Sequence, residues 1–570
     1  MKKQEYFFTD NPRDSVELSL DDGRVITGPR NGRLEAFAKV AQKEHEAMIV
    51  GVVLDGVLRE LTYKLERDGK GSFITMADVD GARIYRRSLI FLLEAAFKRC
   101  FRNGLLTIDH SVSSGGYYCQ VEDEPEFGPE KLTKLEATMR QLVEEDLPFV
   151  RDTVPLEEAV AYFTECGEED KVRLLKYRNR PDLVLYSLGE VRDYHHGYMV
   201  PSTGYLKWFA LEWVGDAFIM HFPRRHKPNG LSPMTKYPKL LKAFQDYGEW
   251  LSKLGIPSVG ALNDAIQMGH IDEVILVSEA LHEMQISNIA DQIQERHDKA
   301  GLVLIAGPSS SGKTTFSKRL GIQLLARGIT PFALEMDNFF IDREKTPLTP
   351  EGEKDFESLR ALDLKRLNKD LRALLTGKKV QLPRYDFLSG LSVDGETAQL
   401  KKDDIIILEG IHGMNPDLLE GIGAEETFKI YVSCLTQLNL DRHNRISTTD
   451  TRLLRRILRD SRDRGYSAEE TISRWEQVRK GETQYIFPYQ ENADAMFNSA
   501  LAYELSALKP LVEPLLRQVR FGTREHIEAK RLLKFLEWFL PISIEYVPSN
   551  SLLREFTGDS LLTNFSVWEH

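Results

Sequence analysis

Residues 301–320, GLVLIAGPSSSGKTTFSKRL, constrain the fold of this chain more than any other stretch. Apolar residues lead into a loop rich in glycine and serine, and a helical pattern follows. The motif G-x-x-x-x-G-K-[ST] is complete at Gly307, Gly312, Lys313 and Thr314. Such a loop joins a buried strand to the start of a helix and binds phosphate through its backbone N–H groups. The strand–helix alternation that follows predicts a parallel sheet with covering helices.

The loop also predicts how a nucleotide is held, with ATP and Mg²⁺ as cofactors. Lys313 reaches the β- and γ-phosphates, and the Thr314 hydroxyl binds Mg²⁺. The alternative is a chance glycine–serine loop, which the strand and helix patterns on either side disfavour. The residues expected to contact ATP are Gly307, Ser309, Ser310, Ser311, Gly312, Lys313, Thr314, Thr315 and, from a later helix, Arg459.

Two carboxylates follow apolar strand patterns downstream of the loop. Glu409 ends the run DDIIILEG, where a phosphate-loop protein needs a carboxylate for Mg²⁺. Asp337 ends the expected strand PFALEMD and is placed to accept the proton of an attacking hydroxyl. The competing interpretations are a surface acid at the end of a strand for Glu409 and a turn cap for Asp337.

An arginine-rich helix is expected over DTRLLRRILRDSRDRG, residues 450–465. At helical spacing, Arg452, Arg455, Arg456 and Arg459 share one face. Such a face can close over ATP and stabilise charge in the transition state. A solvated basic helix, or one that binds RNA, is the alternative.

These motifs together resemble the uridine kinases of the uridine kinase/phosphoribulokinase group over residues 301–500. The matching segments, in order, are GPSSSGKTT, MDNFF, LPRYDF, LEGIHG and DTRLLRRILRDSRDRG. The resemblance implies Asp337 as general base, with Lys313 and Arg455 as further catalytic residues. It also implies Glu409 with Thr314 at Mg²⁺. The substrate-binding residues it implies are Asp337, Phe340, Glu357, Tyr385, Arg452 and Arg455.

The chain departs from that pattern at three positions around the acceptor. Phe340 stands where the family has tyrosine, and Glu357 where it has an aspartate that holds the ribose. Gly390 replaces a histidine that contacts the base. These changes leave the nucleobase preference open.

The front half resembles a different enzyme, threonyl-tRNA synthetase. Residues 52–88 resemble its TGS module and the following segment, and GGYYCQV and VRDYHHGYMVPSTG resemble its editing-type second domain. The editing chemistry of that domain depends on an H-x-x-x-H pair and a later cysteine and histidine. Phe91 and Ala95 are assigned to the paired positions, and His195 and Met199 to the later two. We therefore expect neither a metal nor hydrolysis in this region.

Length and charge bound the rest of the interpretation. The 570 residues are too many for one core, and the net charge of −12 disfavours broad binding of nucleic acid or anionic membrane. Four scattered cysteines and an N-terminal sequence without an apolar run indicate a cytoplasmic protein. The expected fold class is multidomain α/β and α+β, with a mainly parallel sheet in the C-terminal half and small α+β domains in the N-terminal half. The expected domains are a TGS-like, ubiquitin-like module (1–80), a degenerate editing-type domain (81–225), a helical connector (226–284), a phosphate-loop kinase domain (285–500) and a helical appendage (501–570).

Three functions fit the sequence. The leading one is an ATP-dependent kinase acting on the 5′-hydroxyl of a nucleoside, uridine or cytidine. A second keeps the mechanism and changes the acceptor to another small alcohol. A third is an RNA-associated ATP switch in which the TGS-like half binds tRNA. The expected partner is a small-molecule nucleoside, and no membrane association is expected. Binding of nucleic acid through the TGS-like half is disfavoured but left open, as is assembly into a homo-oligomer.

Overall fold

The computed structural model describes residues 13–112, 115–235, 237–349, 352–401 and 403–565. The chain forms two compact units, and both are discontinuous in sequence. Unit 1 contains Met1–Thr235, Arg442–Asn444 and Arg520–Phe535, and unit 2 contains Lys236–Asp441, Arg445–Val519 and Leu536–His570. The predicted multidomain class, with a parallel sheet in the C-terminal half and small mixed sheets in the N-terminal half, is confirmed.

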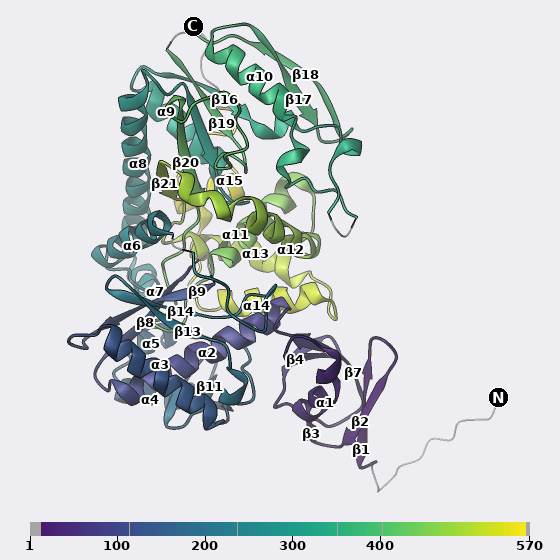
Figure 1. Ribbon diagram of the computed structural model, residues 1–570. Coiled ribbons are helices and arrows are strands. Elements are labelled where there is room, and N and C mark those ends of the chain that lie inside the picture. Colours follow the sequence, from purple (N-terminus) through teal and green to yellow (C-terminus); the bar gives the residue numbers. More distant parts are fainter. Residues whose placement is uncertain (1–12, 113–114, 236, 350–351, 402, 566–570) are drawn as a thin grey trace, which may run out of the picture. The chain divides into compact units, whose positions relative to one another are not determined.

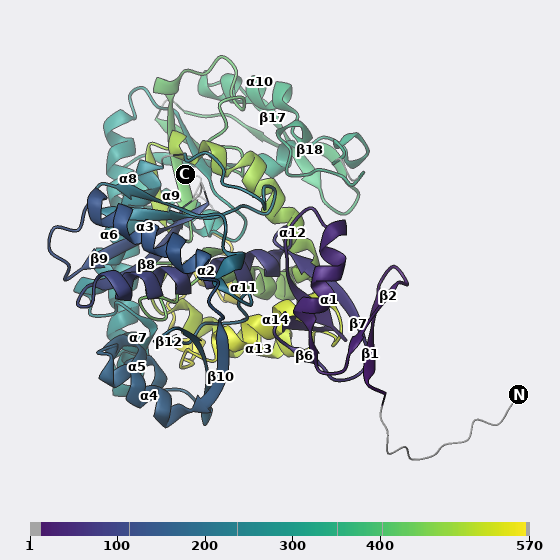
Figure 2. The ribbon, with the colours of Figure 1, turned by 60° about the horizontal axis from the view of Figure 1, so that its bottom comes forward.

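Unit 1 begins with a five-stranded sheet of order β2-β1-β7-β4-β5. Its strands are β1 (Ser15–Leu20), β2 (Val25–Pro29), β4 (Ile49–Leu54), β5 (Val57–Glu60) and β7 (Gly69–Thr75), beside the short pair β3 (Gly32–Arg33) and β6 (Lys64–Leu65). Only β1 and β7 pair in parallel within the sheet. Figure 2 shows helix α1 (Leu34–Ala41) beside strands of this sheet. The helix buries residues at positions i, i+3, i+4 and i+7, which is the spacing of one helical face. These side chains share a core with those of β1 and β4.

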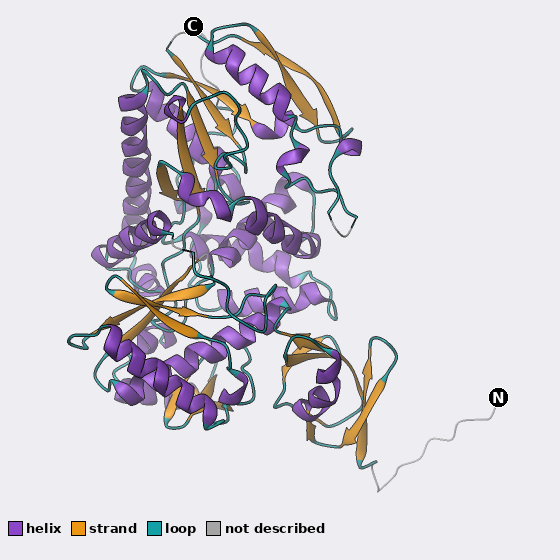
Figure 3. Cartoon of the chain, in the orientation of Figure 1, coloured by secondary structure: helices purple, strands orange, loops and turns teal. Residues whose placement is uncertain are grey.

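The next part of unit 1 packs helices against a four-stranded sheet of order β13-β14-β9-β8, as the layers in Figure 3 show. The sheet consists of β8 (Leu105–Val112), β9 (Gly116–Glu122), β13 (Ala210–Val214) and β14 (Ala217–His221), and its helices are α2 (Val79–Cys100) and α3 (Pro129–Glu144). A three-stranded sheet follows α3, with β10 (Val150–Pro155), β11 (Asp182–Leu188), β12 (Val191–Asp193), α4 (Leu156–Glu165) and α5 (Glu169–Leu175). Helix α14 (Arg524–Leu536) joins this unit through the Glu528 carboxylate, which accepts two hydrogen bonds from Arg83.

Unit 2 is built on a five-stranded sheet of order β16-β19-β15-β20-β21, and every pair in it is parallel. Its strands are β15 (Leu302–Ala306), β16 (Thr330–Glu335), β19 (Asp404–Glu409), β20 (Thr427–Ser433) and β21 (Ala495–Asn498). Strand β15 is buried along its whole length, because a central parallel strand is covered on both faces. Figure 1 shows α8 (Ile271–Arg296) and α9 (Lys313–Leu325) side by side along the sheet.

The remaining elements of unit 2 surround the carboxyl ends of these strands or cover the sheet. They are α6 (Pro238–Lys253), α7 (Val259–Met268), α10 (Leu364–Leu375), the hairpin β17 (Val380–Asp386) and β18 (Leu391–Ala398), α11 (Thr448–Arg459), α12 (Ala468–Tyr485), α13 (Glu504–Arg517) and α15 (Arg554–Thr557). Among the helices that the structure describes, none combines the length and the apolar character needed to cross a membrane.

Candidate active site

The phosphate-binding loop lies between β15 and α9, and its backbone is fixed by glycine. Gly312, with a φ of 89°, takes a left-handed conformation immediately before the helix. A Cβ atom at Gly307 would lie 1.9 Å from the carbonyl oxygen of Val432, so only glycine fits there. The loop therefore has the compact form in which backbone N–H groups at a helix N-terminus hold an anion.

Two loop side chains are positioned as the motif predicts. The Thr314 hydroxyl donates to Oε1 of Glu409 at 3.3 Å. The Nζ atom of Lys313 lies 3.5 Å from the carbonyl oxygen of Pro308, and it forms no ion pair within the described part of the chain. The structure thus brings the predicted Mg²⁺ residues together and leaves the Lys313 charge available to a phosphate.

The predicted carboxylates meet at the carboxyl edge of the sheet. Glu335, the last residue of β16, is the register partner of Glu409 at the end of β19. Asp337 follows two residues later in the 3₁₀ turn η3 (Met336–Phe339), so it lies just beyond the strand. The topology therefore gathers three acids at the edge from which the phosphate loop leaves β15.

Burial raises the pKa values of these three acids, and neighbouring carboxylates add to the shifts of Glu409 and Glu335. Burial raises the pKa of Glu409 to about 7; the charge of Lys313 opposes this shift, and those of Glu555, Glu335 and Asp337 add to it. The side chain of Asp337 reaches solvent, but the surrounding protein still removes water from its carboxylate and so raises its pKa. The charge of Lys313 opposes this shift. Carboxylate oxygens gathered with little positive charge nearby are a donor set suited to Mg²⁺, which binds their deprotonated form.

Glu357 belongs to the same electrostatic group. Burial raises its pKa to about 7, helped by the charges of Glu482 and Asp337, while Arg456 and Lys313 oppose the shift. A Cβ atom placed on Gly481 of α12 would lie 2.7 Å from the Cβ atom of Glu357, so the Glu357 side chain packs closely on that helix. A neutral Glu357 carboxyl can donate a hydrogen bond as well as accept one.

The arginine face of α11 is turned toward the phosphate loop, but two of its arginines are engaged in buried ion pairs. Arg452, 1% exposed, pairs with Glu482 and donates to the Ser309 carbonyl oxygen at 2.9 Å. Arg455, fully buried, pairs with Glu504 and lies 3.4 Å from the Ser310 carbonyl oxygen. Both guanidinium groups hold the loop in place through its carbonyl oxygens. Direct contact of Arg452 and Arg455 with a nucleoside stays a prediction.

The other two arginines of this face reach the loop through its hydroxyl groups. Arg456 donates to Oγ of Ser309 at 2.8 Å, and Arg459 lies 3.4 Å from Oγ of Ser310. Arg459 also lies 3.5 Å from the carboxylate of Glu555. The Ser311 hydroxyl is buried without a hydrogen-bond partner among the described residues.

Aromatic rings gather where the acceptor is expected. The ring of Phe340 lies 5.5 Å from that of Tyr385 and 6.2 Å from that of Phe356, measured between centroids, in edge-to-face arrangements. The Tyr385 hydroxyl is buried and finds no hydrogen-bond partner among the described residues. Gly390, with a φ of 73°, packs against the side chain of Arg343. Rings packed edge to face beside a hydroxyl without a partner form an apolar wall against which a planar ligand can pack.

The positions assigned to editing chemistry in unit 1 hold a different set of groups. The Phe91 ring lies 5.2 Å from that of His195, and Ala95 and Met199 are buried apolar residues. Next to them is a buried cluster of charges that the sequence did not reveal. It consists of Glu94 and Lys98 of α2, Glu168, Lys171 of α5, Asp193 of β12, and His443.

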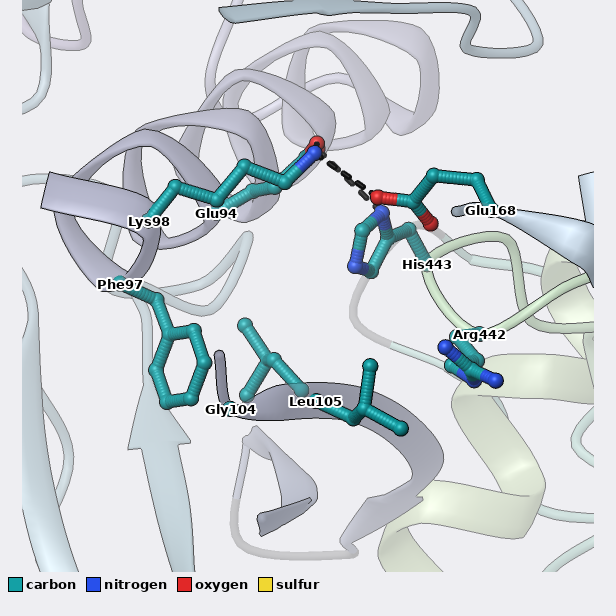
Figure 4. A pocket seen from close by; sticks show the side chains of 9 residues that line it. Glu94, Phe97, Lys98, Gly104, Leu105, Glu168, Arg442 and His443 are labelled. Carbon is teal, nitrogen blue, oxygen red and sulfur yellow. Dashed lines mark hydrogen bonds and ion pairs between the residues drawn. The ribbon is translucent and has the colours of Figure 1, made fainter. Parts of the chain in front are cut away.

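Lys171 is the centre of this cluster. Its ammonium group, fully buried, donates to Oδ2 of Asp193 at 2.7 Å and lies 2.9 Å from Nδ1 of His443. Lys98 pairs with Glu168 at 2.8 Å and with Glu94 at 3.2 Å (Figure 4). The adjoining cavity, of about 30 Å³, has room for a water molecule or two but not for an amino acid or a nucleotide.

Glu94, Asp193 and His195 each place one ligand atom within 4.8 Å of the others, close enough for a metal ion. Burial lowers the pKa of His195 to about 3, so the imidazole is neutral. Burial alone would raise the pKa of Asp193, but Lys171 and His443 outweigh it and hold that pKa well below its usual range. The ammonium of Lys171 thus supplies the positive charge that a metal would bring.

Comparison with known proteins finds different relatives for the two regions. The phosphoribulokinase/uridine kinase family model matches residues 302–505, and these residues are a domain of that family. The N-terminal part is homologous to threonine–tRNA ligase. The ligase of Carboxydothermus hydrogenoformans is 33% identical over 204 residues, which is 36% of this chain and 32% of the ligase. That of Methylococcus capsulatus is 36% identical over 174 residues, 30% of this chain and 27% of the ligase. The chain thus spans about a third of these relatives.

Among solved structures, one described as a possible uridine kinase from Bacillus stearothermophilus is similar to part of the chain. Its sequence identity is 20%, with a TM-score of 0.24, over 36% of this chain and all of that one.

Sequence reasoning missed the acids that organise the site from a distance. Glu482 accepts a hydrogen bond from the Ser309 N–H at 3.0 Å and pairs with both Arg452 and Arg479. Glu504 pairs with Arg455, and Glu555 reaches α9. The signal available in the sequence was the excess of arginine in 450–465, because buried guanidinium groups require carboxylate partners.

Proposed function

We propose that unit 2 is an ATP-dependent kinase that transfers the γ-phosphate of ATP to the 5′-hydroxyl of a nucleoside, uridine or cytidine. The observation that carries the proposal is the meeting of Lys313, Thr314, Asp337 and Glu409 at one edge of the parallel sheet. Phosphoryl transfer needs a cation to neutralise the phosphate, a carboxylate for Mg²⁺ and an acceptor for the hydroxyl proton. These four residues provide all three.

The residues present fit Mg²⁺, because Thr314 and Glu409 place two oxygen atoms 3.3 Å apart beside further carboxylates. When bound, the ion would neutralise charge on the phosphates. The acceptor oxygen attacks the γ-phosphorus, the bond to the ADP oxygen breaks, and the hydroxyl proton passes to Asp337. Lys313 stabilises the charge on the transferred group, and Arg456 and Arg459 hold the loop.

The acceptor class is inferred from the surroundings of Asp337. Phe340, Phe356 and Tyr385 form an aromatic surface suited to a nucleobase, and a Glu357 carboxyl with a pKa of about 7 suits ribose hydroxyl groups. A phosphorylated sugar would instead place its own negative charge near Asp337 and Glu357. These features favour a neutral nucleoside over a sugar phosphate.

The test is ATP consumption across a panel of nucleosides and small alcohols, with and without tRNA. We expect turnover with uridine or cytidine and no dependence on tRNA. Lys313→Ala should reduce kcat by about 10²-fold or more, because it removes a charge on the transferred phosphate without opening a core. Near-normal turnover of this variant would refute the assignment. ATP hydrolysis that requires tRNA would favour the RNA-associated switch.

We further propose a cytoplasmic protein whose front half keeps a TGS-like module and an editing-type domain without editing chemistry. The supporting observations are the homology to threonine–tRNA ligase and the ion-paired cluster around Lys171. Binding of tRNA to this half and self-association into an oligomer are separate hypotheses. Gel shift and sedimentation measurements on the full chain test them.

A further inference from the structure

The C-terminal strap, residues 549–563, packs against the start of the phosphate-loop helix. Its anchors Ser551, Leu552, Leu553 and Phe556 are buried. The Leu552 side chain lies so close to Gly312 that a Cβ atom on this glycine would be 2.5 Å from it. At its far end, the carbonyl oxygens of Leu562 and Thr563 accept hydrogen bonds from Lys318 at 2.7 and 2.9 Å. Unit 2 therefore covers its own phosphate loop.

The strap places a carboxylate at an anion-binding position. Oε2 of Glu555 accepts a hydrogen bond from the backbone N–H of Thr315 at 3.1 Å. Thr315 is the third residue of α9, and its N–H is one of the free donors of the first helical turn. Such donors attract negative charge, and in a phosphate loop they bind the nucleotide.

A second anion-binding group faces the same carboxylate. Arg459 of α11 lies 3.5 Å from Oε1 of Glu555, and its guanidinium carbon lies 6.0 Å from the centre of the Phe556 ring. Arg462 donates to the backbone carbonyl oxygen of Glu555 at 2.9 Å. Figure 1 shows α15, which carries Glu555 and Phe556, next to α11. The strap thus uses both a loop N–H and an arginine that the sequence assigns to ATP.

We propose that Glu555 is an internal competitor of the nucleotide: its carboxylate takes the place of an ATP phosphate at Thr315 and Arg459 and must leave when ATP binds. The inference rests on the proposed nucleotide site. A phosphate and this carboxylate cannot share one N–H group, and two negative charges at that spacing repel each other. The affinity for ATP is then reduced by the fraction of molecules in which Glu555 occupies the site.

Isothermal titration of the full chain with ATP and Mg²⁺ tests the proposal. Glu555→Gln keeps the size of the side chain and removes its charge, so we expect the Kd for ATP to fall about tenfold. Glu545→Gln, which changes an exposed acid shortly before the strap, is the matched control and should bind as the unaltered chain does. In the unaltered chain, ATP should also increase hydrogen exchange at residues 554–558, because the turn that presents Glu555 rearranges.

The outcomes separate this inference from the function on which it rests. If the unaltered chain binds ATP while Glu555→Gln binds equally or more weakly, the competitor is refuted and the kinase site stands. Protection of residues 554–558 by ATP would likewise refute it and make the strap part of the nucleotide site. If neither chain binds ATP, the proposed function fails, and the inference fails with it.

Discussion

Each unit of this chain holds a cluster of carboxylates, and the two clusters differ in how their negative charge is balanced. In unit 1, Glu94, Glu168 and Asp193 are all ion-paired with Lys98 or Lys171. In unit 2, Glu335, Asp337, Glu357 and Glu409 form no ion pair within the described residues, although Lys313 is near. The first cluster contains its own cations, Lys98 and Lys171, whereas the second would take a cation from outside.

The pKa shifts follow this division for Glu168 and Asp193 but not for Glu94, whose pKa burial and the charge of Asp193 raise to about 7. Burial alone would raise the pKa of Glu168, but Lys171, His443 and Lys98 lower it to about 2. Burial raises the pKa of Glu409 and Glu357 to about 7, since the opposing charges are too few. A carboxylate that is ion-paired within the fold stabilises the structure. A carboxylate without a positively charged partner in the fold is available to bind a metal ion or to accept a proton.

The largest expected effect is at Asp337. Asp337→Asn keeps the shape and removes the proton acceptor, so kcat should fall by about 10²–10⁴-fold, with the nucleoside KM changed much less. Steady-state kinetics measures this. Glu335→Gln changes the last residue of β16, the strand that precedes Asp337, and is the control. Its kcat should fall less than that of Asp337→Asn. A near-normal kcat for Asp337→Asn would move the base elsewhere, with Glu357 next to be tested.

In unit 1 the matching change is expected to affect stability instead. Lys171→Met removes a buried ammonium group and leaves Asp193 without its cation. The free energy of unfolding should therefore fall by about 3–5 kcal/mol. Hydrogen exchange of the backbone amides in α5 and β12 measures this loss of stability and should become faster. Lys176→Met, an exposed lysine one residue beyond α5, is the control and should change stability by about 0.5 kcal/mol or less. Unchanged exchange in Lys171→Met would show that the cluster is not held by its lysine.

A smaller effect concerns the pH dependence of Mg²⁺ binding. The raised pKa of Glu409, about 7, means that a proton competes with the ion below neutrality and leaves as pH rises. The apparent Kd for Mg²⁺ should therefore fall about tenfold between pH 6 and pH 8. Calorimetric titration at both pH values measures it, with Glu409→Gln as the control. A Kd that does not vary with pH would contradict the raised pKa.

The smallest expected effect is none at all. Glu94, Asp193 and His195 lie close enough to hold a metal, but Lys171 supplies the positive charge. We therefore expect the purified chain to contain no zinc beyond that of a His195→Ala variant, and not to deacylate mischarged tRNA. Elemental analysis and a deacylation assay check this. Stoichiometric zinc that disappears in His195→Ala would overturn it.

The sequence predicted the parts of the kinase site that follow directly from local pattern. The phosphate loop, the strand ending at Glu409 and the acid after β16 are each fixed by a short run of residues around one strand. Parallel pairing then brings their ends together at one edge. Asp337 alone was displaced, into the turn after the strand.

What the sequence did not predict depends on residues far apart in the chain. The partners of Arg452, Arg455 and Arg459 are Glu482, Glu504 and Glu555, which share no motif with them. In unit 1, Lys171 and His443 are 272 positions apart. A carboxylate that neutralises a buried cation can come from any segment that packs nearby, so only the fold identifies it.

The discontinuity of unit 1 also affects the order in which the protein can fold during synthesis. Its first 235 residues leave the ribosome early, but its remaining segments end at Phe535, about 300 residues later. At typical elongation rates of about 5–20 residues per second, that interval lasts roughly 15–60 s. Arg83 lacks Glu528 until near the end of this time, and Lys171 lacks His443 until the short middle segment of unit 1 has been made. The front half of the nascent chain can therefore complete these two contacts only after the C-terminal part has been made.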